Sequence, residues 1–143
     1  MKEPVYVDSN IFLFSVIYEG IPKAKRAEEV LRKIATGELE AYTSTLTWDE
    51  VVWVVYKVMG YADSVEIGRK LLAFPNLRLI SVSSEVIIEA QRLMEGYRLS
   101  PRDPIHCASA LLRGVKLSIS EDEDFDVVKE LVRLSLKDFI EKL

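Results

Sequence analysis

The sequence is short of the features that mark secreted or membrane proteins. Cys107 is the only cysteine among 143 residues, so no internal disulfide can form. There is no signal-peptide region and no apolar run of about 18 residues, the length that a membrane-spanning helix needs. We therefore expect a cytoplasmic protein with no membrane association.

Glycine and proline are also scarce, at six and five residues, and no linker or internal repeat interrupts the chain. Apolar residues make up 49% of the sequence and charged residues 29%, which is typical of a globular chain without a disordered tail. A chain of this length can bury a core without disulfides or a structural metal. We expect a single domain over residues 1–143.

The chain has no excess of positive charge, and its net charge is −4. This balance argues against a protein that holds nucleic acid on a broad basic surface. The objection weakens if several acids converge on bound cations, because divalent metals offset local negative charge. Net charge alone therefore does not exclude a nucleic-acid substrate.

What the sequence does contain is an alternation of short apolar strands with helices. Apolar runs and turn signals predict strands at 5–7, 39–44, 77–82, 115–119 and 132–136. Periodicity predicts helices at 23–35, 51–59, 84–96, 105–113 and 137–142, and another that ends before Pro75. Segment 11–18 suits a strand or a helix equally well. This alternation predicts a three-layer α/β fold with a central, mainly parallel sheet flanked by helices.

Capping signals fix where several helices should begin. Thr47 and Glu50 fit a capping box ahead of 51–59, and Asp63 or Ser64 can cap the helix before Pro75. Asp103 fits an N-cap with proline at the first helical position. The 51–59 helix is apolar on nearly every side, so it needs cover from the sheet and from a second subunit. We therefore expect a homodimer.

Four acids fall where strands meet helices: Asp8, Glu50, Asp103 and Asp122. Such junctions all lie at one edge of a parallel sheet, so these carboxylates can meet in space. Singly, each has a simpler explanation as a cap or as part of a solvated loop. Together they favour a shared site, because gathered carboxylates repel one another unless a cation or proton compensates.

The donor set predicts the metal. Carboxylates without a histidine and cysteine set favour Mg²⁺ or Mn²⁺ over zinc, and such ions commonly act on phosphate substrates. His106 is the only histidine and lies three residues after Asp103 on the same expected helix. A general base is one interpretation, but we expect a structural role for it. We expect Cys107 to be a small buried residue.

Four segments together resemble the PIN domain family, and within it the VapC toxins of toxin–antitoxin pairs. They are VYVDSN (5–10), STLTWDEV (44–51), DPIHCASA (103–110) and SISEDEDFD (118–126). The resemblance implies metal-binding acids at Asp8, Glu50, Asp103 and Asp122, with Asp124 or Asp126 as an additional ligand. It also implies a Mg²⁺- or Mn²⁺-dependent endoribonuclease that often forms homodimers and is inhibited by a small VapB antitoxin.

Other residues near the acids have supporting roles in this interpretation. By the resemblance, Asn10 and Ser120 are the small polar residues that accompany the acids. Asn10 could orient Asp8 or a bound water, or it could simply cap a helix, and both interpretations stay open. Arg98 and Arg102 precede Asp103 closely enough to contact the RNA substrate.

Three other functions remain as alternatives. The chain could be a non-catalytic PIN-like module that binds RNA or a partner, or an RNA-processing nuclease that is not a toxin. A receiver-like phosphoacceptor would also end its strands in acids. It would need an acid pair after the first strand and a lysine in the late loop, and the sequence has neither at the expected place.

Overall fold

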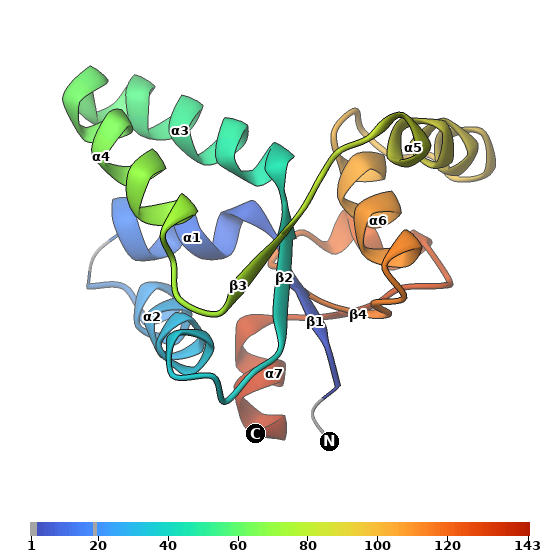
Figure 1. Cartoon of the computed structure of the whole chain (residues 1–143). Helices are drawn as coiled ribbons and strands as arrows, with labels where there is room; N and C mark the ends of the chain where they lie inside the picture. The colour runs from blue at the N-terminus through green and yellow to red at the C-terminus, as the bar shows by residue number, and fades with distance from the viewer. Residues whose placement is uncertain (1–2, 19) are drawn as a thin grey trace.

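The protein is built on one five-stranded parallel sheet (Figure 1). The computed structural model describes residues 3–18 and 20–143. Its strands are β1 (Val5–Val7), β2 (Ala41–Ser44), β3 (Leu77–Ile80), β4 (Leu117–Ile119) and β5 (Val132–Leu134). Their order is β3-β2-β1-β4-β5, and every pairing is parallel. The predicted parallel sheet is confirmed.

Helices connect the strands. They are α1 (Ser9–Ile17), α2 (Pro22–Ala35), α3 (Thr45–Met59), α4 (Tyr61–Leu72), α5 (Ser84–Gly96), α6 (Asp103–Leu112), α7 (Leu136–Lys142) and the short 3₁₀ helix η1 (Glu123–Val127). The segment that suited a strand or a helix is thus helical. Across 3–18 and 20–143, none of these helices has both the length and the apolar character needed to cross a membrane.

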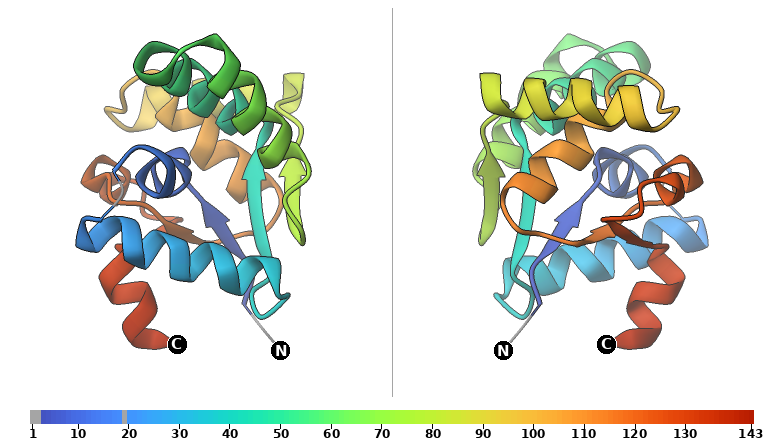
Figure 2. Two further views of the ribbon diagram at one scale, coloured as in Figure 1. Left: turned by 90° about the vertical axis from the view of Figure 1, so that its left-hand side faces the viewer. Right: turned by 90° about the vertical axis from the view of Figure 1, so that its right-hand side faces the viewer.

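The central strand β1 contributes side chains to two hydrophobic cores, one on each face of the sheet. Val5 and Val7 are buried with the apolar sides of α1, α2, α3, α4 and α7, whereas Tyr6 is buried with α5 and α6. Successive residues of a strand point to opposite faces, which explains this division. Figure 2 shows α2 and α7 together on one side, and Figure 1 shows α5 and α6 on the other. The predicted three-layer arrangement is confirmed.

The predicted capping box at Thr47 and Glu50 is wrong. Helix α3 begins at Thr45, directly after β2, and its N-cap residue Ser44 makes no side-chain capping bond. The Thr47 hydroxyl instead lies 2.6 Å from Thr43 Oγ1 in the interior. The helix starts too early for Thr47 to cap it, so the Glu50 carboxylate is free for another use.

Two further predicted caps are wrong for the same reason. Helix α6 begins at Asp103 itself, with Arg102 as the N-cap residue, so Asp103 lies inside the first turn. Helix α4 begins at Tyr61. Ser64 therefore donates its hydroxyl hydrogen bond back to the Tyr61 carbonyl, at 2.6 Å, rather than capping the helix.

The strand order defines where a ligand would bind. From β1 the chain moves outward through β2 to β3, and then returns to the other side of β1 with β4 and β5. In open parallel sheets, ligands bind outside the carboxyl ends of the strands at such a switch point. Here the switch point lies between the ends of β1 and β4.

Candidate metal centre

Asp8 is the first residue after β1 and is held by both of its carboxylate oxygens. Oδ1 accepts a hydrogen bond from the Ser9 backbone N–H at 2.8 Å, so Asp8 also caps α1. Oδ2 accepts one from the Ser120 hydroxyl, at 2.7 Å, just beyond β4. Only 5% of Asp8 is exposed, and this burial raises its pKa despite the opposing effect of His106. Asp8 is therefore fixed at the switch point.

Ser120 joins Asp8 to the acidic loop. Its Oγ accepts a hydrogen bond from the Asp122 backbone N–H at 3.0 Å and lies 3.4 Å from Asn10 Nδ2, which donates to it. Within 3–18 and 20–143, Asn10 Oδ1 is the one buried side-chain oxygen or nitrogen that has no hydrogen-bond partner. It is thus an available acceptor beside Asp8.

Glu50 reaches the site from α3 and meets His106 from α6. The distance from His106 Nε2 to Glu50 Oε1 is 2.5 Å, and the same nitrogen is 3.7 Å from Asp8 Oδ1. Burial acts to raise the pKa of Glu50, but the hydrogen bond and charge of His106 outweigh it and lower that pKa. Burial acts to lower the pKa of His106, and Tyr6, Glu50 and Asp8 together raise it well above its ordinary value.

A second group of carboxylates consists of Asp103, Asp122 and Asp124. One oxygen from each lies within 4.8 Å of the others, as do single ligand atoms of Asp8, Glu50 and His106. Burial, followed by the charges of Asp122 and Asp8, raises the pKa of Asp103 to about 7. The charge of Asp8 acts on Asp103, so the two groups belong to one electrostatic site.

The remaining acids of the late loop have other partners. Asp126 accepts hydrogen bonds from Arg133 at 2.7 and 3.1 Å, and hydrogen bonding to Arg133 lowers the pKa of Asp126. Arg133 also donates to the Ser120 carbonyl at 2.9 Å. Glu121 pairs with Lys23 at 3.2 Å and accepts from the Leu136 backbone N–H. Among the three aspartates of this loop, Asp122 and Asp124 face Asp103, whereas Asp126 braces the loop.

The two arginines expected to contact substrate differ in position. Both are exposed in the loop between α5 and α6. The charge of Arg102 helps to lower the pKa of Glu50, which puts Arg102 at the rim of the acid site. Arg98 makes no hydrogen bond or ion pair with the rest of the chain that the structure describes.

Sequence reasoning missed the hydrogen bonds of His106. We expected a structural residue, and the side chain is indeed 3% exposed, but its ring contacts Glu50 rather than only apolar neighbours. Its other ring nitrogen lies 2.6 Å from the Tyr6 hydroxyl. The available signals were the spacing of His106 from Asp103 on one helix and the polar tip of Tyr6 within an apolar strand.

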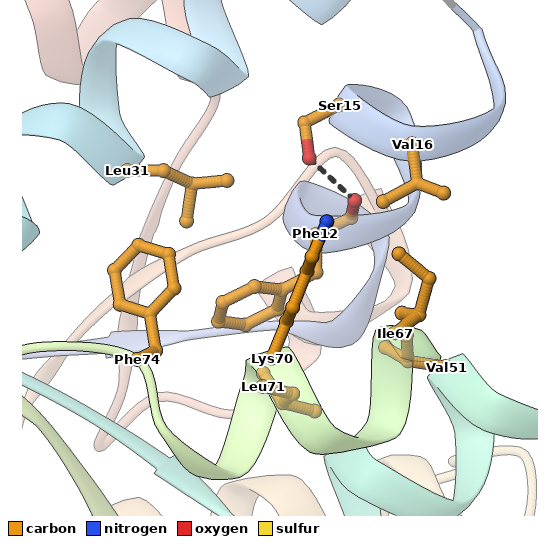
Figure 3. Close-up of a pocket in the computed structure, with 9 residues that line it drawn as sticks. All are labelled: Phe12, Ser15, Val16, Leu31, Val51, Ile67, Lys70, Leu71 and Phe74. Carbon is orange, nitrogen blue, oxygen red and sulfur yellow. Dashed lines mark hydrogen bonds between the residues drawn. The ribbon is translucent and has the colours of Figure 1, made fainter. Parts of the chain in front are cut away.

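A separate cavity of about 160 Å³ lies between α1, α2, α3 and α4. Figure 3 shows that its walls are almost entirely apolar. The Ser15 hydroxyl in the wall is already used, because it donates to the Phe12 carbonyl at 2.7 Å. No carboxylate is among its lining residues: Phe12, Ser15, Val16, Leu31, Val51, Ile67, Lys70, Leu71 and Phe74. The cavity is unsuited to a cation.

The fold and the site define an α/β protein that gathers carboxylates at the switch point of a parallel sheet. A sequence model described as the PIN domain matches residues 5–131. The chain therefore belongs to the PIN domain family. A comparison with curated proteins finds no match.

Solved structures with the same fold include several toxin–antitoxin proteins. VapBC2 from Rickettsia felis, bound to promoter DNA, has a TM-score of 0.71 and 13% identity, covering 92% of this chain and 98% of that one. VapC20 from Mycobacterium tuberculosis, a sarcin-ricin loop cleaving toxin, has a TM-score of 0.72 and 15% identity, covering 87% and 95%. A toxin–antitoxin complex from Klebsiella pneumoniae has a TM-score of 0.65 and 22% identity, covering 90% and 95%. At these identities the likeness establishes the fold.

Proposed function

We propose that the protein is a divalent-metal-dependent endoribonuclease and the toxin of a VapBC-type pair. The observation that carries this proposal is that five carboxylates, from four separate parts of the chain, form two groups near the switch point, Asp8 with Glu50 in one and the other three in the second. The five are Asp8, Glu50, Asp103, Asp122 and Asp124. An isolated acid here could be a cap, but acids gathered in this way repel one another unless a proton or a cation compensates, and a bound cation is the compensation that we propose.

The side chains fit Mg²⁺ or Mn²⁺. The donors are mainly carboxylate oxygens, which hard divalent cations prefer. Asn10 Oδ1 is buried and unpartnered, so it would be available as an acceptor beside such an ion. Asp8 and Glu50 in one group, and Asp103, Asp122 and Asp124 in the other, would supply the ligands of one or two such ions. When bound, such an ion activates water for attack on a phosphodiester and stabilises the developing negative charge.

The protein's own contribution is to orient these groups. Ser9 N–H and Ser120 hold the Asp8 carboxylate from two directions, and Arg133 braces the loop that carries Asp122. The RNA backbone would approach the exposed rim, where Arg102 can contact a phosphate. Arg98, farther along the same loop, is a second candidate for that contact.

The test is cleavage of RNA by the purified protein. We expect cleavage with Mn²⁺ or Mg²⁺, none with EDTA, and a loss of at least ~100-fold in rate in Asp8→Asn. Glu50→Gln should lose activity too, whereas Asp49→Asn, the exposed neighbour on the same helix, should retain it. Undiminished cleavage by folded Asp8→Asn would refute the metal site. Mn²⁺ binding without RNA cleavage would favour the non-catalytic binding module.

The proposed partner is a VapB-type antitoxin. Its support is that several structures of this fold are toxin–antitoxin complexes. Expression of the chain alone should then arrest bacterial growth, and co-expression with the product of an adjacent reading frame should relieve the arrest. Growth that continues normally while the purified protein cleaves RNA would favour the RNA-processing nuclease.

We also propose a homodimer. Trp53 and Tyr56 stack on α3 with ring centroids 5.8 Å apart, yet they are 50% and 46% exposed. Tyr61, at the start of α4, is 73% exposed. Aromatic side chains gathered on an exposed face are characteristic of protein interfaces.

A further inference from the structure

A chain of buried polar side chains reaches Glu50 from inside the protein. The Tyr6 hydroxyl lies 3.0 Å from Ser44 Oγ and 2.6 Å from His106 Nδ1, and His106 Nε2 lies 2.5 Å from Glu50 Oε1. Tyr6 is 1% exposed and His106 3%. These residues come from β1, β2, α6 and α3, so the chain links four elements behind the acid site.

The chemistry of the groups fixes the role of the histidine. An ionised carboxylate can only accept hydrogen bonds, so His106 Nε2 must carry the proton that it shares with Glu50. Nδ1 faces a hydroxyl, which can either donate or accept. Both ring nitrogens are therefore satisfied, and rotation of the ring would break both contacts at once.

Packing holds the ring in this orientation. Tyr6 and Phe125 both meet it edge to face, with ring centroids 5.7 and 6.4 Å away. Glu50, in contrast, is a long side chain that is partly exposed at 17%. Without a partner, its carboxylate would be free to sample several rotamers and to turn toward solvent.

We propose that His106 is a positioning residue that presents Glu50 to the cation, and that Tyr6 holds His106 in place for this task. The inference rests on the metal site of the proposed function. Residues that orient metal ligands in this way typically contribute about 10–100-fold to metal affinity. An imidazole nitrogen that donates to Glu50 does not itself bind the metal.

The test measures Mn²⁺ affinity by titration calorimetry on the purified chain, with no RNA present. His106→Leu should lower the affinity by about 10–100-fold, and Tyr6→Phe, which keeps the ring and removes the hydroxyl, should lower it less. His106→Gln should recover part of the loss, because its amide can donate toward Glu50. The two milder variants carry the test if His106→Leu does not fold, as judged by thermal unfolding.

A double-mutant cycle separates positioning from general stability. In a Glu50→Gln background, His106→Leu should cause little further loss of Mn²⁺ affinity, since its partner is already changed. An equal loss in both backgrounds would overturn the proposal, as would wild-type affinity in folded His106→Leu. Leu112→Ala, an exposed position on the same helix as His106, is the control and should bind Mn²⁺ as the wild type does.

The two proposals fail separately. If the wild type binds Mn²⁺ but cuts no RNA, and the His106 variants bind Mn²⁺ weakly, the nuclease proposal fails and the positioning role stands. If the wild type cuts RNA with Mn²⁺ and folded His106→Leu retains both affinity and rate, the nuclease proposal stands and the positioning role fails.

Discussion

Asp103 is a carboxylate in an environment that disfavours its charge. Half-buried at the start of α6, it shares the site with Asp122, Asp124 and Asp8. Its position in the first turn of a helix is favourable for an anion, but burial and its acidic neighbours dominate. Its pKa therefore rises from an ordinary 3.8 to about 7 in the metal-free protein.

This shift predicts a pH-dependent stability. The unfolded chain loses the Asp103 proton near pH 3.8, while the folded chain keeps it until about pH 7, so stability falls as the pH rises across that window. Asp103→Asn should therefore raise the metal-free Tm by a few degrees at pH 8 and hardly at all at pH 4. Calorimetric scans of both proteins at the two pH values measure this.

Adding Mn²⁺ provides a control for the Asp103→Asn substitution. Saturating Mn²⁺ should raise the Tm of the wild type at pH 8, because it binds only the folded state, and should raise that of Asp103→Asn much less. A variant that is destabilised equally at both pH values would contradict the assigned cause.

Asp8 and His106 differ in how well their surroundings could be predicted from the sequence. Asp8 was predictable as a metal-site candidate, because an acid directly after a buried strand must lie at the sheet edge. The structure confirms that Asp8 caps α1, and it places the Asp8 charge near the other acids; the metal-binding role stays a prediction. The hydrogen bond between the Tyr6 hydroxyl and His106 Nδ1 was not predictable, since those residues are 100 positions apart in the sequence.

At the scale of elements, the amphipathic helices are the most predictable feature. Apolar residues at helical spacing predicted one buried side for α2 and one for α5. The prediction is confirmed for α2 and, in α5, for Val86, Ala90 and Leu93. It is wrong for Ile87 and Met94 of α5, which are 46% and 43% exposed. Helix starts were less predictable. Local capping signals at Thr47, Ser64 and Asp103 were overridden, because the end of β2 and the packing of the helices set where each helix begins.

The buried side of α5 leads to a stability prediction. Leu93 is 0% exposed, and Leu93→Ala should cost about 2–5 kcal/mol of unfolding free energy through lost burial and the cavity left behind. Leu112→Ala, on α6, is the matched control, because Leu112 is 53% exposed and its loss should cost roughly 0.5 kcal/mol or less. Urea denaturation measures both, and similar midpoints for the two variants would contradict the assignment of Leu93 to the core.

At the scale of the whole molecule, the exposed aromatic side of α3 predicts self-association. Trp53→Lys places a charge in the proposed interface and should shift the protein from dimer to monomer. Light scattering measures this change in mass. The rate of RNA cleavage per folded protomer is measured on the same sample. Val132→Lys, at 57% exposure on the edge strand β5, is the control and should leave the assembly unchanged. A wild-type protein that is monomeric at all accessible concentrations would refute the dimer.

The sequence by itself determined the five strands, the helices other than α1 and η1, the parallel arrangement and the set of acids. Strand and helix periodicity and the position of an acid after a strand are local properties. The tertiary structure alone decided which acids share a site. Asp122 and Asp124 meet Asp103, whereas Asp126 turns to Arg133. It also decided that Glu50 bonds to His106 rather than to a helix end. These contacts form because the strand order brings the side chains within hydrogen-bond distance of one another. No local sequence pattern specifies the distance between residues that are far apart in the chain.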